Sequence, residues 1–218
     1  EYPIVFTGES GMLPQALLGP KTGVNAYVSN DGRWQARYIP AHLRRYPFVA
    51  ARIQAAEGDQ QKGDMRVAID GAAPQLNESE GQLLFTEDGK PTDLLNKVQQ
   101  VLVSLQRDME ATQRLVEQLE SYDLLVAQTI KVRQPRGEPH QLDGLRVVDQ
   151  KTFKALDRDA LSDLQQTGAL NLIYAHFVSL TNLNDGVLAQ RPLPEAQAQA
   201  GQPTPPSDDT GDLVFDFD

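Results

Sequence analysis

The feature that most constrains the fold is an apolar repeat between residues 91 and 121. Apolar side chains recur there at spacings of three and four, which is the period of one face of an α-helix. The spacing predicts a single long helix over 91–121, with Pro91 at its first position and Asp93 where the helix dipole favours a negative charge. The repeat consists of Leu95, Val98, Leu102, Leu105, Met109, Thr112, Val116 and Leu119.

The same spacing also fits the a and d positions of a coiled coil. We favour a helix that covers the sheet of its own domain, because the segment holds only about four heptads and few charges at the e and g positions. A dimer through the 91–121 helix stays open as the alternative.

Short strands are predicted on both sides of this helix. Upstream, residues 2–6 form a compact apolar run, residues 24–38 alternate around an Asn-Asp-Gly turn, and residues 65–69 alternate again. Downstream, residues 126–133 and 142–149 flank a longer loop. We therefore expect strands and hairpins at either end of the long helix.

A helical cluster is predicted near the end of the folded part. Asp149 and Asp157 are each placed to cap a short helix, and Gly168 is placed to end the second one. Residues 169–184 are apolar on most sides, which predicts a helix buried in the core. Strands and segregated helices together indicate the α+β class.

The composition changes at residue 192. Residues 192–218 are rich in Pro, Gln, Ala and Asp, with six acidic side chains and no Lys or Arg. Such a segment buries too little apolar surface to offset the entropy of ordering. We expect one domain over 1–191 and a disordered acidic tail over 192–218. The net charge of −10 argues against nucleic-acid binding, because phosphates favour a positive surface.

The tail ends in large apolar side chains set among acids. Acids keep such a peptide extended and steer it towards a basic groove, and its phenylalanines supply anchors. We weigh a docking peptide equally with a solubilising tail, and an export signal is a third alternative. The partner-binding candidates are Leu213, Val214, Phe215, Asp216, Phe217 and Asp218.

Recognisable catalytic and metal-binding motifs are missing from the sequence. Cysteine is absent, which removes thiolate metal sites and cysteine nucleophiles. The glycines around Ser10 lack the spacing of a nucleophile elbow, and Pro20 interrupts the likeness to a phosphate loop. The three histidines form no helical pair of metal ligands. We expect no cofactor and favour a protein without catalytic activity, with an enzyme left open.

One cluster of residues indicates an anion site. His42, Arg44, Arg45 and Tyr46 lie close in the sequence, and two guanidiniums beside an imidazole suit a carboxylate or a phosphate. Folding could bring His176 to the same place. The alternative, which we favour, is that the arginines pair with nearby carboxylates and that His176 is a core histidine held by one hydrogen bond.

No apolar run approaches the roughly 20 residues that a membrane span requires. The N-terminal sequence also lacks the features of a signal peptide, although the first residue is Glu rather than Met and truncation is open. We favour the cytoplasm as the compartment and leave the periplasm and the cell surface as alternatives.

Several segments together resemble the bacterial SapC family. They run in family order over about residues 2–191, and no single one of them is diagnostic. The two most specific are YIPAHLRRYPF at 38–48 and the LIYAHFVSL part of GALNLIYAHFVSL at 168–180. The others are YPIVF at 2–6, Pro14 with ALLG at 16–19, Gly23 and Asn25, the turn at 31–34, LLFTEDGKP at 83–91 and DGLRVVDQKTFKAL at 143–156.

The resemblance implies an association with surface-layer genes by name, and an accessory role beside outer-membrane receptors and halogenase-like flavoproteins by gene neighbourhood. It also implies a further stretch before residue 2 and brings no defined active site. A peptide-transporter permease that shares the name is excluded by the missing membrane span. We therefore expect an accessory protein that engages a peptide or protein partner. A surface-layer component, or a small-anion-binding protein or enzyme that uses the His42 cluster, stays open.

Overall fold

The computed structural model describes residues 1–7, 13–21, 23–52, 65–132 and 140–190. These residues form antiparallel sheets together with helices, so the predicted α+β class is confirmed. The tail predicted over 192–218 lies outside the described residues.

The larger sheet has four strands in the order β2-β1-β6-β5, and every pair is antiparallel. A second sheet pairs β3 with β4, its two strands among the described residues. The bounds are β1 Ile4–Thr7, β2 Gln15–Ala16, β3 Phe48–Arg52, β4 Met65–Ile69, β5 Leu125–Val132 and β6 His140–Val148. The hairpin predicted around residues 126–149 is thereby confirmed.

Strand β6 contains a bulge at Gly144. The register with β5 shifts by one residue there, and Gly144 adopts a φ of 72° that glycine tolerates without a steric penalty. Across the bulge, the Thr129 hydroxyl donates a hydrogen bond of 2.7 Å to Asp143. Leu142 and Leu145 therefore pack against the same core although they are three residues apart.

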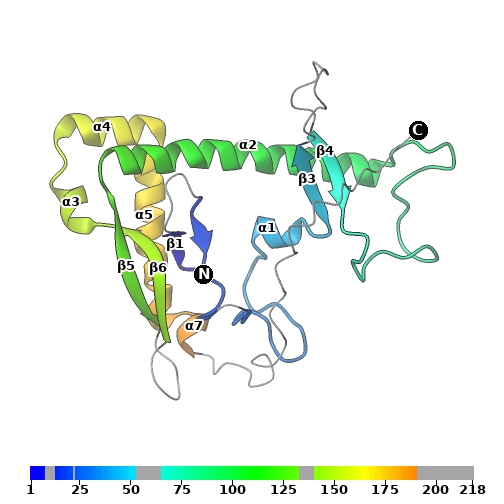
Figure 1. The fold of residues 1–218 in the computed structure, drawn as a ribbon, viewed down its shortest axis with the longest axis horizontal. Helices are drawn as coiled ribbons and strands as arrows, with labels where there is room; N and C mark the ends of the chain where they lie inside the picture. The colour runs from blue at the N-terminus through cyan, green and yellow to red at the C-terminus, as the bar shows by residue number, and fades with distance from the viewer. Residues whose placement is uncertain (8–12, 22, 53–64, 133–139, 191–218) are drawn as a thin grey trace, which may run out of the picture.

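One long helix and six shorter ones lie around these strands in the described part of the chain (Figure 1). Among them, α5 contacts β1 and β6 of the larger sheet, and α2 contacts β3 of the second sheet. The bounds are α1 Ala41–Arg44, α2 Asp93–Ser121, α3 Gln150–Lys154, α4 Arg158–Thr167, α5 Ala169–Leu180, α6 Asn182–Asp185 and α7 Val187–Gln190.

The predicted caps of the short helices are confirmed. Asp149 accepts hydrogen bonds from the first backbone amides of α3, and Asp157 accepts one from Ala160 in α4. Gly168 ends α4 with a φ of 88°. The prediction for Pro91 is wrong, because α2 begins at Asp93 behind the cap Thr92, and Pro91 instead forms a β-bridge with Phe85.

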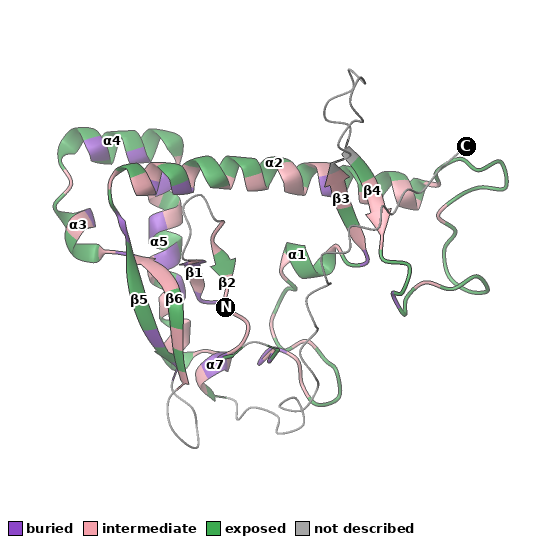
Figure 2. Ribbon diagram, viewed as in Figure 1, coloured by how far each residue is buried: buried purple, intermediate pink, exposed green. Residues whose placement is uncertain are grey.

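Two hydrophobic cores occupy the two faces of the larger sheet. The first packs the C-terminal half of α2 with α3, α4 and α5, and includes Phe6, Leu119 and Ile173. The second lies under the segment 13–38 and α7, around Tyr27. Figure 2 shows that buried positions gather where α2 meets α4 and α5, whereas the other half of α2 is mostly exposed or half-buried. The long helix therefore covers the sheet with one half only.

The hairpin predicted over 24–38 is reduced to a single bridge between Val28 and Trp34. The reason is local, since the backbone amide of Tyr27 bonds to the Asn25 side chain. Ala26 and Tyr27 are both buried although they are adjacent, so the alternation is broken.

The helix predicted over 169–184 is shorter and less buried than expected. It ends at Leu180, and its outer face leaves Tyr174 and Val178 53% and 69% exposed. The outer side of α5 is therefore open, because the sheet and α4 cover only its inner side.

Candidate functional site

The segment PAHLRRYPF folds into a helical turn followed by a strand. Pro40 precedes α1 with a φ of −51°, which suits the start of a helix, and the backbone amide of Phe48 bonds to the carbonyl oxygen of Arg45 at the entry to β3. This places the basic end of α1 beside the N-terminal half of α2 (Figure 1). Residues 50 positions apart in the sequence thus form one surface.

A groove of about 340 Å³ lies between these elements. Its floor is apolar and combines Val98, Val101, Leu102 and Leu105 of α2 with Phe48 of β3. Val101 is 56% exposed, Val98, Leu105 and Phe48 are half-buried, and Leu102 is buried, so the described part of the chain leaves part of this floor open to solvent. The remaining lining residues are Ala41, Arg44, Arg45, Tyr46 and Lys97.

Three cations edge the groove. Arg44 and Lys97 are exposed and Arg45 is half-buried. Among the described residues, none of the three lies within ion-pair distance of a carboxylate. From the sequence we favoured the alternative that neighbouring acids pair with these arginines. The described residues do not show such pairs.

His42 lies beside this cationic edge. Its Nε2 atom lies 3.3 Å from the guanidinium of Arg45, and a guanidinium only donates hydrogen bonds, so Nε2 is the acceptor. Partial burial and the charge of Arg45 both lower the pKa of His42. The imidazole is therefore neutral at pH 7 and helps to orient Arg45.

Tyr46 lines the groove through its ring while its hydroxyl is held from outside. The hydroxyl donates a hydrogen bond of 2.9 Å to Asp70, which follows β4, and this bond raises the pKa of Tyr46. Asp70 also accepts a bond from the backbone amide of Ala72. The second sheet therefore fixes one wall of the groove.

His176 does not line the groove. It is fully buried on α5, where Nδ1 lies 2.8 Å from the carbonyl oxygen of Ile4 and Nε2 accepts a hydrogen bond of 3.1 Å from the amide of Val148. The two partners fix the proton on Nδ1. Burial lowers the pKa of His176, so the ring stays neutral. The structure therefore brings together His42, Arg44, Arg45 and Tyr46 and leaves His176 in the core.

Both nitrogens of His176 bond to the backbone of the sheet. The β1–β6 register pairs Phe6 with Arg146, and its continuation sets Ile4 opposite Val148. The imidazole bridges those two residues in place of a direct backbone hydrogen bond. Nearby, the amide of Ile4 donates to Ser179, the next inward residue of α5. This histidine thus has a role in joining the strands, with two hydrogen bonds rather than the one expected.

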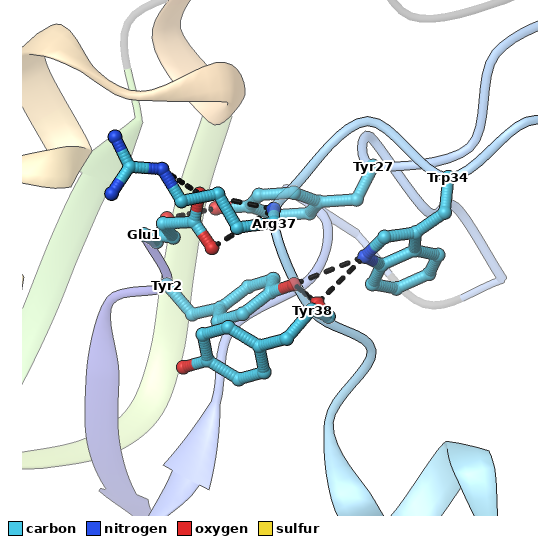
Figure 3. A network of polar contacts seen from close by, with 6 residues as sticks. All are labelled: Glu1, Tyr2, Tyr27, Trp34, Arg37 and Tyr38. Carbon is cyan, nitrogen blue, oxygen red and sulfur yellow. Dashed lines mark hydrogen bonds and ion pairs between the residues drawn. The ribbon is translucent and has the colours of Figure 1, made fainter.

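A second polar cluster surrounds the N-terminal segment (Figure 3). The indole of Trp34 donates to the carbonyl oxygen of Tyr38 at 2.9 Å, the Tyr2 hydroxyl bonds to the same oxygen, and the Tyr27 hydroxyl donates to the carbonyl oxygen of Glu1. Burial raises the pKa of Tyr27. Because these polar atoms bond to one another, the cluster holds the segment 27–38 on the sheet and offers few atoms to a ligand.

The predicted partner-binding residues Leu213, Val214, Phe215, Asp216, Phe217 and Asp218 lie outside the described residues. Sequence reasoning missed Lys97, Phe48 and Val101 as members of the groove. None of the three belongs to the apolar repeat of the long helix, and Phe48 lies on β3, so no sequence pattern pointed to them.

The part of the chain that the structure describes holds no group of three His, Asp or Glu side chains able to bind a metal ion. In the same part, every helix is too short or too polar to cross a membrane.

The fold and the groove define an α+β protein with an apolar groove edged by cations. A model of the SapC family matches residues 1–185, and the chain belongs to this family. The comparison with curated proteins and the comparison with solved structures each returned no match.

Proposed function

We propose that this SapC-family protein is a non-catalytic accessory protein that binds an acidic peptide or protein segment in the groove between α1 and α2. The observation that carries the proposal is the pairing of a partly exposed apolar floor with three cations that have no carboxylate partner among the described residues. The apolar floor suits the apolar side chains of such a peptide, and the cations suit its acidic side chains.

The floor favours a peptide over a small inorganic anion. Val98, Val101 and Leu105 offer apolar surface, which gains free energy only when another apolar group covers it, at about 25 cal/mol per Å². Acidic residues beside that anchor would meet Arg44 and Lys97, which favours encounter and orientation. An acidic peptide with large apolar side chains meets both requirements.

The proposal is tested with short fluorescent peptides and anisotropy. One peptide alternates Asp with Phe, a second has Lys in place of Asp, and a third has Ser in place of Phe. Only the first should bind. Both the wild type and the Phe215→Ser/Phe217→Ser variant are measured, so that the acidic tail of the chain does not mask the groove.

Charge reversal supplies the specificity test. The Arg44→Glu/Arg45→Glu variant should bind the Asp–Phe peptide at least about tenfold more weakly and should gain affinity for the Lys–Phe peptide. The Lys154→Glu/Arg158→Glu variant is the matched control, because it changes the net charge equally on exposed residues of α3 and α4. Val101→Ser should also weaken binding while it leaves the fold intact.

Two results would overturn the proposal. One is that neither the wild type nor the Phe215→Ser/Phe217→Ser variant binds the Asp–Phe peptide. The other is an equal loss in the groove variant and in the control variant, because that would reduce the effect to overall charge.

A further inference from the structure

We propose that, when no partner is present, the groove between α1 and α2 holds residues 213–218 of the same chain. The inference rests on the proposed function, since it names an occupant for the same groove. It makes the acidic end of the chain an internal competitor of the partner.

The first support is charge complementarity. The groove presents Arg44, Arg45 and Lys97, and the described residues supply no carboxylate to any of them. Residues 192–218 hold six acidic side chains and no basic ones. Five of the six acids lie within residues 208–218. This segment thus carries the opposite charge in a short length.

The second support is the pattern of apolar residues in that segment. Phe215 and Phe217 alternate with Asp216 and Asp218, so an extended backbone would direct the two aromatic rings to one side and the acids to the other. The groove has the same division, with its apolar floor on α2 and its cations along the edge. A volume of about 340 Å³ gives room for an aromatic anchor.

The third support is reach. The last described element ends at Gln190, and residues 191–212 provide a linker of 22 residues. Fully extended, this linker spans up to about 70–80 Å, whereas the whole of α2 is about 44 Å long. The linker is therefore longer than the longest helix of the described fold. A tether of this kind raises the local concentration of the segment to roughly the millimolar range, so even weak docking fills the groove.

The experiment compares full-length chains with the fluorescent Asp–Phe peptide. The wild type should bind this probe at least about fivefold more weakly than the Phe215→Ser/Phe217→Ser variant. The reason is that a groove occupied by the tail leaves a smaller fraction of molecules free to bind the probe. The Gln197→Ser/Gln199→Ser variant, altered only in the linker, should match the wild type. Adding Arg44→Glu/Arg45→Glu to the tail variant should remove the tighter binding.

The outcomes separate the two proposals. Equal affinity of the wild type and the tail variant for the probe would overturn the internal competitor and leave the groove as a binding site. No binding by either chain would overturn both. Light scattering decides the geometry: a monomeric wild type with the weaker probe affinity supports docking within one chain. A wild-type dimer that the tail variant does not form would overturn it in favour of docking in a second copy.

Discussion

The side chain of His176 links two strands of the larger sheet, β1 and β6, through hydrogen bonds. It occupies the position where the β1–β6 ladder would continue from Phe6 and Arg146, and it satisfies the carbonyl of Ile4 and the amide of Val148. A buried backbone group that loses its partner costs about 1–3 kcal/mol. A single residue of α5 thereby couples the helix to two strands.

Replacing His176 should destabilise the protein. We expect His176→Phe to lower the free energy of unfolding by about 2–5 kcal/mol, because two backbone groups lose their partners. His176→Gln, which keeps one donor and one acceptor, should lose less. Denaturant unfolding measures both variants, with Ala175→Ser on the exposed side of α5 as the control. A loss no greater than that of the control would contradict this role.

Acid should destabilise the fold through the same residue. The pKa of His176 is lowered in the folded state from an ordinary value of 6.5, so the unfolded chain takes up its proton first. Stability is therefore full above pH 6.5 and falls as the pH drops below it towards the lowered pKa. Unfolding at pH 7.5 and pH 5 should show a smaller decrease for His176→Gln than for the wild type. An identical pH profile would contradict the assignment.

At the scale of elements, a bulge sets the direction of side chains in β6. Leu142 and Leu145 would lie on opposite faces of a regular strand, because side chains alternate with period two. The extra residue at Gly144 turns both towards the core that contains Tyr27. The positive φ of Gly144 is thus needed by the packing on one face of the sheet.

Gly144→Ala should lower the free energy of unfolding by about 1–2 kcal/mol, the steric cost of a β-carbon in the left-handed region. No atom lies within 4 Å of the added carbon, so the cost is conformational. Gly71→Ala is the matched control, since it also meets no atom there and its φ is not positive, and it should be neutral. Equal effects of the two substitutions in thermal unfolding would contradict this interpretation.

At the scale of the whole molecule, α2 connects a hydrophobic core at its C-terminal half with the groove at its N-terminal half. Its C-terminal half lies in the core with α4 and α5, and the half-buried ion pair between Glu120 and Arg146 ties it to β6 at 2.8 Å. Its N-terminal half meets α1 and β3 and forms the groove. A dimer through α2 stays an alternative prediction, and it would cover Val101 and so compete with any peptide in the groove.

Most of the elements could be predicted from the sequence because their signals are local. The period of α2 and the Asp149 and Asp157 caps each involve a few neighbouring residues. The reduced hairpin over 24–38 could not be predicted. The Asn25 side chain accepts a hydrogen bond from the backbone amide of Tyr27, which a regular strand would have used to pair with its neighbour. Local signals therefore fail where a side chain competes with the backbone.

The sequence by itself determined the α+β class, the long helix and the basic cluster of His42, Arg44 and Arg45. Only the tertiary structure decided what these residues face. It placed Lys97 and Val101 beside the arginines, and it buried His176 between two strands. The physical reason is that helix period and capping act over a few residues, whereas a groove depends on contacts between segments about 50 residues apart, which no local pattern encodes.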